Sequence, residues 1–235
     1  MDQQTFVIPL WADLTAVGLG GIQGALFASG FRGQRRLDFL GVAIIGIMLG
    51  LGGGMTRDLL LNVTPRMLES NWYLVTAGGA ALLGMLLAGI FQRLNAVIVG
   101  LDAVVIGMFG AFGTTKALSF GLPVIPALFV GVSAAVGGGV LRDVLVGLPV
   151  AIMHVGSLYA VAAGAGAAAL IALHALGVPI TVAAIIGIAV TTVIRLLAVI
   201  FDLSLPEQRM LYRRKVAVET TRIAIVPPAE EAPGR

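Results

Sequence analysis

Seven apolar stretches, each about 20 residues long, alternate with short polar connections along the chain. A bilayer core about 30 Å thick needs roughly 20 apolar residues in a helix, so each stretch predicts one transmembrane helix. Proline stands in or beside the connections at positions 65, 123, 149 and 179, where a helix has to end. The predicted spans are Leu10–Phe31, Phe39–Asn62, Trp72–Phe91, Ala96–Thr115, Pro123–Val146, Val155–Ala175 and Ile180–Phe201.

The composition supports this interpretation and excludes several classes of protein. Hydrophobic residues make up 58% of the 235 residues, and the mean hydropathy is +1.02. Charged residues make up 11%, against about 25% in soluble domains. Soluble enzymes, secreted disulfide scaffolds and disordered chains are therefore excluded. The chain has no cysteine, which also excludes a thiolate metal site and a cysteine nucleophile. We expect an integral membrane protein and no enzyme.

Basic residues gather on one side of the predicted spans if the helices alternate in direction. Cytoplasmic loops hold the excess of Lys and Arg, so the N-terminus is predicted outside and the C-terminus in the cytoplasm. The pI near 9.8 reflects this excess and does not indicate nucleic-acid binding. The basic residues on the cytoplasmic side are Arg32, Arg35, Arg36, Arg93, Arg209, Arg213, Arg214 and Lys215.

One motif occurs twice in the sequence. Residues 51–61, LGGGMTRDLLL, reappear as residues 136–146, VGGGVLRDVLV, 85 positions later. Tyr73 corresponds to Tyr159 at an offset of 86, and Asp13 corresponds to Asp102 at an offset of 89. Each repeat holds three spans, an odd number, so the second copy enters the membrane from the opposite face.

The predicted fold is therefore an all-α integral membrane protein with seven transmembrane helices. Two inverted-topology three-helix repeats are followed by a seventh helix that has no counterpart. The predicted divisions are residues 10–91 for the first repeat, 95–175 for the second, 179–203 for the seventh helix and 204–235 for a polar, flexible cytoplasmic tail.

The two glycine triplets have two possible explanations. Each interior helix glycine costs roughly 1 kcal/mol relative to alanine, so a triplet needs a compensating benefit. A ridge of small residues at Gly46, Gly50 and Gly54 would let helices approach closely. A kink or unwinding at the triplets would free backbone carbonyls toward a cavity, and we favour it because close packing does not require three glycines in a row. The triplets are Gly52, Gly53 and Gly54, and Gly137, Gly138 and Gly139.

Charged residues inside the spans are the candidate functional residues. Such charges are costly in a bilayer and mark a pathway through the protein. Adjacent residues do not face each other on a helix, so the Arg-Asp neighbours are expected to pair elsewhere, with Asp13 and Asp102 as rival partners across the two halves. Arg195 has Asp202 as a possible partner. The alternative is that the motif charges anchor helix ends at the interface. The candidates are Asp13, Arg57, Asp58, Asp102, Lys116, Arg142, Asp143 and Arg195.

The doubled motif in a chain of three, three and one spans resembles the bacterial members of the trimeric intracellular cation channel (TRIC) family, also described as tandem glycine-transporter domains. The resemblance covers about Asp13 to Pro206. Further pieces that carry it are Leu37–Gly41, Phe109–Leu118, Leu158–Val161, Arg195 and Leu205-Pro206. Lys116 occupies the place of a basic residue in many relatives, whereas the first repeat has Phe27–Gly30 at the corresponding place.

The resemblance implies a homotrimer in a bacterial inner membrane, with one pore per protomer between the repeats. The second and fifth spans would bend at the glycines and line that pore together with the charged candidates. The implied permeant ions are monovalent cations, chiefly potassium or else sodium, with no cofactor. Animal members carry a different, lysine-containing motif linked to lipid binding, so gating by lipid is not carried over, and membrane lipids are expected only as surroundings.

Two activities fit the paired charges equally well. Arginines alone would repel cations from a pore, whereas arginines neutralised by paired aspartates would let cations pass. The same pairs would hold a zwitterion, with its carboxylate on Arg and its ammonium on Asp, which makes a glycine carrier with alternating access the alternative. A passive scaffold predicts neither flux. No metal site is expected, because His154 and His174 stand alone at span ends.

Overall fold

The structure, a computed structural model, describes residues 8–31, 37–91, 95–153 and 158–204. Its elements are α1 (Leu10–Gly30), α2 (Phe39–Leu60), α3 (Arg66–Glu69), α4 (Asn71–Phe91), α5 (Asn95–Ser119), α6 (Val124–Val146), the short 3₁₀ helix η1 (Ala151–Met153), α7 (Tyr159–Ala175) and α8 (Ile180–Ile200). No β-strand occurs within these ranges. His154, residues 205–235 and the basic residues at 32, 35, 36 and 93 lie outside them.

The long helices coincide with the predicted apolar stretches to within a few residues. Six of them (α1, α2, α4, α5, α6 and α8) are long and apolar enough to cross a membrane, and α7 is a shorter apolar helix of 17 residues. The largest difference is α5, which continues through Lys116 to Ser119. The all-helical membrane architecture is thus confirmed. The inverted relation of the two repeats stays a prediction.

Local sequence explains where several helices begin and end. Pro9, Pro123 and Pro179 directly precede α1, α6 and α8, where a residue without an N–H group breaks no helical hydrogen bond. Asp38 caps α2, because its Oδ1 accepts a hydrogen bond of 2.7 Å from the backbone N–H of Gly41. Gly147 ends α6 in the left-handed region with φ of 71°, a conformation that glycine adopts without strain.

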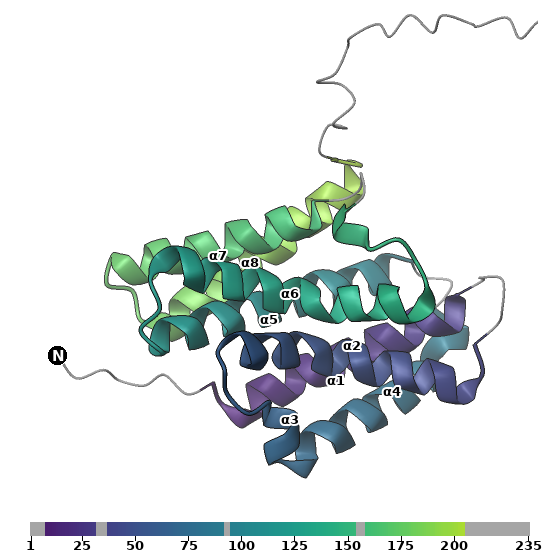
Figure 1. Ribbon diagram of the computed structural model, residues 1–235. Helices are drawn as coiled ribbons and strands as arrows, with labels where there is room; N and C mark the ends of the chain where they lie inside the picture. Colours follow the sequence, from purple (N-terminus) through teal and green to yellow (C-terminus); the bar gives the residue numbers. More distant parts are fainter. Residues whose placement is uncertain (1–7, 32–36, 92–94, 154–157, 205–235) are drawn as a thin grey trace, which may run out of the picture. The chain divides into compact units, whose positions relative to one another are not determined.

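The helices form two groups that meet along α2 and α6. In the first group α1 packs against α2 and α4, and in the second α5 packs against α6 and α8 while α7 packs against α8. The groups are joined where α2 contacts α6 and where α1 contacts α5. Figure 1 shows α2 and α6 running side by side between the two groups. The two motifs therefore lie on the helices that form the contact.

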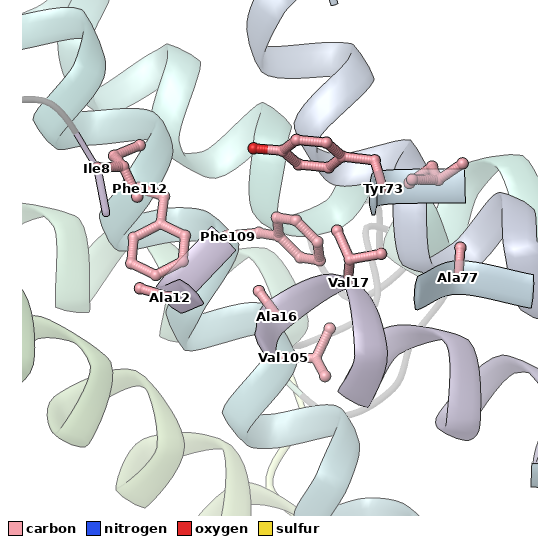
Figure 2. Packing of buried hydrophobic residues seen from close by; sticks show 10 residues of the cluster. Ile8, Ala12, Ala16, Val17, Tyr73, Ala77, Val105, Phe109 and Phe112 are labelled. Carbon is pink, nitrogen blue, oxygen red and sulfur yellow. The ribbon is translucent and has the colours of Figure 1, made fainter. Parts of the chain in front are cut away.

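The apolar core between the groups is built from small residues and a few aromatic rings. One cluster brings Ala12, Ala16 and Val17 of α1 against Phe109 and Phe112 of α5, with residues of α2 and α4 beside them (Figure 2). Large apolar side chains point outward instead; Leu86, Ile125 and Leu176 are 78%, 80% and 81% exposed. This distribution is typical of a membrane protein, where small residues let helices approach and lipid covers the larger ones.

The glycine triplets serve the contact between α2 and α6. Both helices run without interruption through their triplets, so the triplets are not unwound, while a kink stays a prediction. A Cβ on Gly52 would lie 2.8 Å from the Cα of Gly138, and one on Gly53 would lie 2.7 Å from the carbonyl oxygen of Ala134. At these two positions the backbones pass too close to each other to admit a methyl group, whereas a Cβ on Gly54 would meet only Arg57 Nη2, at 3.8 Å.

We expect Gly138→Ala to destabilise the protein by about 1–3 kcal/mol, because the new methyl group would lie 2.6 Å from the carbonyl oxygen of Leu49. Gly79→Ala is the matched control, since nothing lies within 4 Å of a Cβ at this exposed helical position. The control should gain up to about 1 kcal/mol from helix propensity. Thermal unfolding in detergent measures both, and equal midpoints would contradict the packing role.

Candidate functional site

Charged side chains gather at two places, one at the C-terminal end of each motif helix. The Arg57 cluster consists of Asp13, Arg57, Asp58, Arg66, Tyr73 and Lys116. The Arg142 cluster consists of Gln23, Phe27, Asp102, Arg142, Asp143, Tyr159 and Arg195. All eight charges proposed from the sequence fall in these two clusters.

Arg57 is held between two carboxylates inside the protein. Its Nε donates to Asp58 Oδ1 at 2.7 Å, and its Nη1 donates to Asp13 Oδ1 at 3.2 Å. Its Nη2 donates to both, at 3.2 Å to Asp58 Oδ2 and 3.4 Å to Asp13 Oδ2. The three side chains are each 1% exposed. Arg57 lies in the last turn of α2, but its side chain is enclosed by protein and does not extend toward solvent as a snorkelling anchor would.

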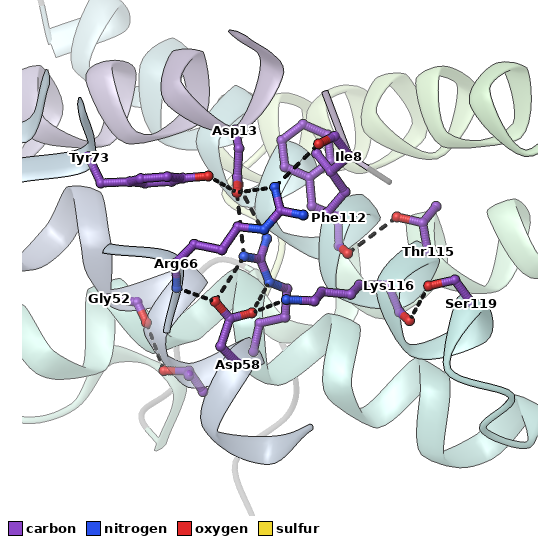
Figure 3. Close-up of polar contacts among 12 residues, drawn as sticks. Ile8, Asp13, Gly52, Asp58, Arg66, Tyr73, Phe112, Thr115, Lys116 and Ser119 are labelled. Atoms are coloured by element: carbon purple, nitrogen blue, oxygen red, sulfur yellow. Dashed lines mark hydrogen bonds and ion pairs between the residues drawn. The ribbon is translucent and has the colours of Figure 1, made fainter. Parts of the chain in front are cut away.

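Asp58 also joins the two helix groups. Its Oδ1 accepts a hydrogen bond of 2.8 Å from Lys116 Nζ of α5, and its Oδ2 accepts one of 3.0 Å from the backbone N–H of Arg66 (Figure 3). Tyr73 of α4 donates its hydroxyl proton to Asp13 Oδ2 at 2.9 Å. Charge-assisted bonds of this length are the stronger ones in proteins. The cluster therefore ties α1, α2, α4 and α5 together.

The Arg142 cluster repeats part of this arrangement. Nε and Nη2 of Arg142 donate to Asp143 Oδ1 at 2.9 and 2.7 Å. Asp143 Oδ2 accepts 2.9 Å from the backbone N–H of Ala151, which corresponds to Arg66 at the motif offset of 85. The guanidinium carbon of Arg142 lies 4.2 Å from the ring centroid of Phe27, within the range of a cation–π contact.

Asp102 is bound by three side chains from three other helices. Arg195 of α8 donates from Nη2 at 3.1 Å and from Nε at 3.3 Å to Asp102 Oδ2. Asp102 Oδ1 accepts a hydrogen bond of 2.6 Å from the side-chain amide of Gln23 of α1 and one of 3.4 Å from the hydroxyl of Tyr159. The Arg195 guanidinium also lies over the Tyr159 ring, 4.9 Å from its centroid. Asp102 thus links α1 to the second helix group.

Three predictions about the pairing are wrong. Each motif arginine does pair with the aspartate that follows it, because the long arginine side chain at a helix end folds back onto the neighbouring carboxylate. Arg57 pairs with Asp13 of its own repeat and not across the repeats; Lys116 and Gln23 make the cross-repeat contacts. Arg195 pairs with Asp102 and not with Asp202, since α8 packs directly against α5.

Comparisons with known proteins agree on the family. The family model described as "Glycine transporter" matches twice, over residues 10–89 and 99–175. A solved structure described as the structural basis for conductance through TRIC cation channels aligns with a TM-score of 0.75 and 30% identity over 86% of this chain and 98% of its own. The chain belongs to the bacterial TRIC-type family. It is a multi-pass membrane protein.

Further members of the TRIC-type family align over most of the chain. The TRIC trimeric intracellular cation channel orthologue from Rhodobacter sphaeroides has a TM-score of 0.74 and 33% identity, over 83% of this chain and 98% of that one. The inner membrane protein YadS of Escherichia coli is 32% identical, over 83% of this chain and 94% of its own length. A membrane protein of Deinococcus radiodurans is 34% identical, over 68% of this chain and 73% of its own length.

Sequence reasoning missed five residues of the two clusters: Gln23, Phe27, Arg66, Tyr73 and Tyr159. Tyr73 and Tyr159 bind corresponding aspartates, and their shared offset of 86 was the available signal. Phe27 corresponds to Lys116 at the offset of 89 that relates Asp13 to Asp102. Gln23 carried no such signal. Among the described residues no group of three His, Cys, Asp or Glu side chains is placed to hold a metal ion.

We expect Arg57→Met to destabilise the protein by about 3–5 kcal/mol, because Asp13 and Asp58 lose their buried partner. Adding Asp13→Asn should recover part of the loss, which a double-mutant cycle measures as coupling of about 0.5–3 kcal/mol. Arg66→Met is the matched control and should cost about 1 kcal/mol or less, since Arg66 is partly exposed. Equal thermal midpoints for Arg57→Met and Arg66→Met would contradict the assignment.

Proposed function

We propose that the chain is a monovalent-cation channel, chiefly for potassium, with one pathway per protomer of a homotrimer. Similarity at 30% and 33% identity to structures described as TRIC cation channels supports the channel and the trimer. The pathway runs between the helix groups, where α2 contacts α6, and passes the Arg57 cluster and the Arg142 cluster in turn. Potassium or sodium is the permeant ion, and no cofactor takes part.

The observation that carries the proposal is the ion pair between Asp58 and Lys116. It joins α2 to α5, and therefore the two groups of helices, at 2.8 Å. While the pair is closed, the Arg57 cluster holds two carboxylates against three cations, and this net charge of +1 opposes the entry of a cation. When Lys116 withdraws, the carboxylate gains negative potential and attracts a hydrated cation. Separation of Lys116 from Asp58 is thus the opening step at the Arg57 cluster.

The glycine triplets give α2 and α6 the freedom that opening requires. The two backbones touch directly at Gly52 and Gly138, so the helices bend against each other there, with Leu141 and Thr56 as the neighbouring side chains that have to move. Thr56 supports bending, because its hydroxyl donates at 2.8 Å to the carbonyl oxygen of Gly52 one turn earlier. Bending at the triplets widens the pathway.

Within the membrane the two repeats, residues 10–91 and 95–175, have opposite orientations, followed by the seventh span over 179–203 and the tail over 204–235. The N-terminus lies outside and the C-terminus in the cytoplasm, as the distribution of Lys and Arg favours. The Arg57 cluster then faces the outside and the Arg142 cluster the cytoplasm. The bacterial inner membrane is the location, as the description of the Escherichia coli relative favours.

A glycine carrier is the second candidate, and the description of the matching family model favours it. Paired Arg and Asp side chains at each end would bind the carboxylate and the ammonium group of glycine. The two candidates differ in speed, because a carrier needs a conformational step of about μs–ms in every cycle and so moves at most roughly 10⁶ molecules per second.

The purified protein in planar bilayers with potassium chloride should give discrete single-channel current steps. Proteoliposomes of the same preparation should take up no radiolabelled glycine against its gradient. Saturable glycine uptake without current steps would contradict the channel and support the carrier. Absence of both fluxes would support a passive scaffold. Empty liposomes and bilayers are the controls.

Neutralising the two partners of the Asp58–Lys116 pair should change the cation current in opposite directions. Asp58→Asn raises the net charge of the Arg57 cluster from +1 to +2 and should lower the potassium current several-fold, whereas Lys116→Met lowers that charge to zero and should raise the current. In a carrier both variants should lower glycine uptake, because each removes half of a zwitterion site. Thr15→Val, at an exposed position of α1, is the control. Equal losses of current in both variants would contradict the proposed role.

A further inference from the structure

The two clusters hold their motif arginines with different strength. Arg57 binds two carboxylates, Asp13 and Asp58, with four hydrogen bonds. Arg142 binds one carboxylate within the described residues, Asp143, with two hydrogen bonds to a single oxygen. The Arg57 side chain is 1% exposed and that of Arg142 is 11% exposed. The second motif arginine is therefore the less constrained of the two.

Arg195 explains the missing carboxylate. Asp102 corresponds to Asp13, and by the pattern of the first repeat it would bind Arg142. Arg195 occupies its Oδ2 with two hydrogen bonds, while Gln23 and Tyr159 occupy its Oδ1. Arg195 belongs to α8, which lies outside both repeats. A helix without a counterpart thus takes the carboxylate that Arg142 would need.

Phe27 supplies the substitute contact. It stands where the second repeat has Lys116, and its ring lies 4.2 Å from the Arg142 guanidinium carbon. Lys116 binds a carboxylate directly, whereas a phenyl ring attracts a cation only through its quadrupole. The contact keeps Arg142 in place without a second ion pair, and it is lost more easily than one.

We propose that Phe27 and Arg195 are positioning residues that make Arg142 the movable charge of the pathway, while Arg57 stays fixed. The inference rests on the proposed function and assigns the main gate to the Arg142 cluster. Opening moves the guanidinium off the Phe27 ring, and closing returns it. Arg195 keeps Asp102 occupied throughout, so that Arg142 has no second carboxylate to lock onto.

Single-channel recordings of a ring series at position 27 test the gate. Phe27→Leu removes the quadrupole and should raise the open probability roughly two- to tenfold, whereas Phe27→Trp strengthens the contact and should lower it. Phe27→Tyr should stay near the wild type. Phe129→Leu is the matched control, since it removes an exposed ring from the helix that carries Arg142. A shift in the same direction for Leu and Trp, or an equal shift in the control, would overturn the proposal.

Arg195→Met should act oppositely to Phe27→Leu. It frees Asp102 to bind Arg142, so the open probability should fall. A purely structural role of Arg195 predicts loss of trimer or of folded protein without a change in gating, which size-exclusion chromatography separates from the recordings. An open probability that rises in correctly assembled Arg195→Met protein would overturn the proposal.

A second measurement does not depend on channel activity. The chain has no cysteine, so Arg142→Cys and Arg57→Cys each introduce a single thiol. A water-soluble thiol reagent should modify position 142 at least about tenfold faster than position 57, because exposure controls thiol reactivity. Equal rates would overturn the proposal even in a protein that conducts. Planar bilayers that show no current would instead reject the proposed function. The rates of thiol modification would then still show which arginine is less tightly held.

Discussion

The structure depends on one constraint, which is that each buried carboxylate needs a cation as its partner. A charge in a low-dielectric interior is costly unless it is paired and hydrogen-bonded. Asp13, Asp58, Asp102 and Asp143 are all buried, and every one accepts hydrogen bonds from Arg or Lys. These demands connect α1, α2, α5 and α8 more specifically than apolar packing could, because lipid competes equally well for an apolar surface.

Small residues make this pairing possible. An aspartate side chain is short, so a cation from another helix reaches it only where the backbones are near. A Cβ on Gly20 of α1 would lie 2.9 Å from the Cα of Gly50 on α2, so these two helices run close together beside the pair that Arg57 forms with Asp13. Small residues thus set the helix separation that a short aspartate side chain needs.

The sequence predicts the helices and the members of the site, but not their partners. Runs of apolar residues and the doubled motif locate the spans and all eight charges, since both depend on residue type and spacing alone. The pairing of Arg57 with Asp58 escapes such reasoning, because helical periodicity places Cβ atoms and not the ends of long side chains. Arg195 with Asp102, and Gln23 beside them, depend on how α8 and α1 pack, which no local pattern encodes. The sequence could not show that the triplets stay helical, because a glycine that admits a neighbouring backbone and one that unwinds a helix are the same residue.

Helix α8 lies outside the two repeats, and its Arg195 makes the charged sites of the two repeats different. Two like halves related by inversion would offer the same surface chemistry to both compartments and would have no means of telling one from the other. Arg195 on α8 ends this equivalence, because it alters the surroundings of one aspartate and leaves its counterpart untouched. In the proposed inverted arrangement, Arg195 and the exchange of Lys116 for Phe27 therefore make the two ends of the pathway chemically different, so that each membrane face meets its own site.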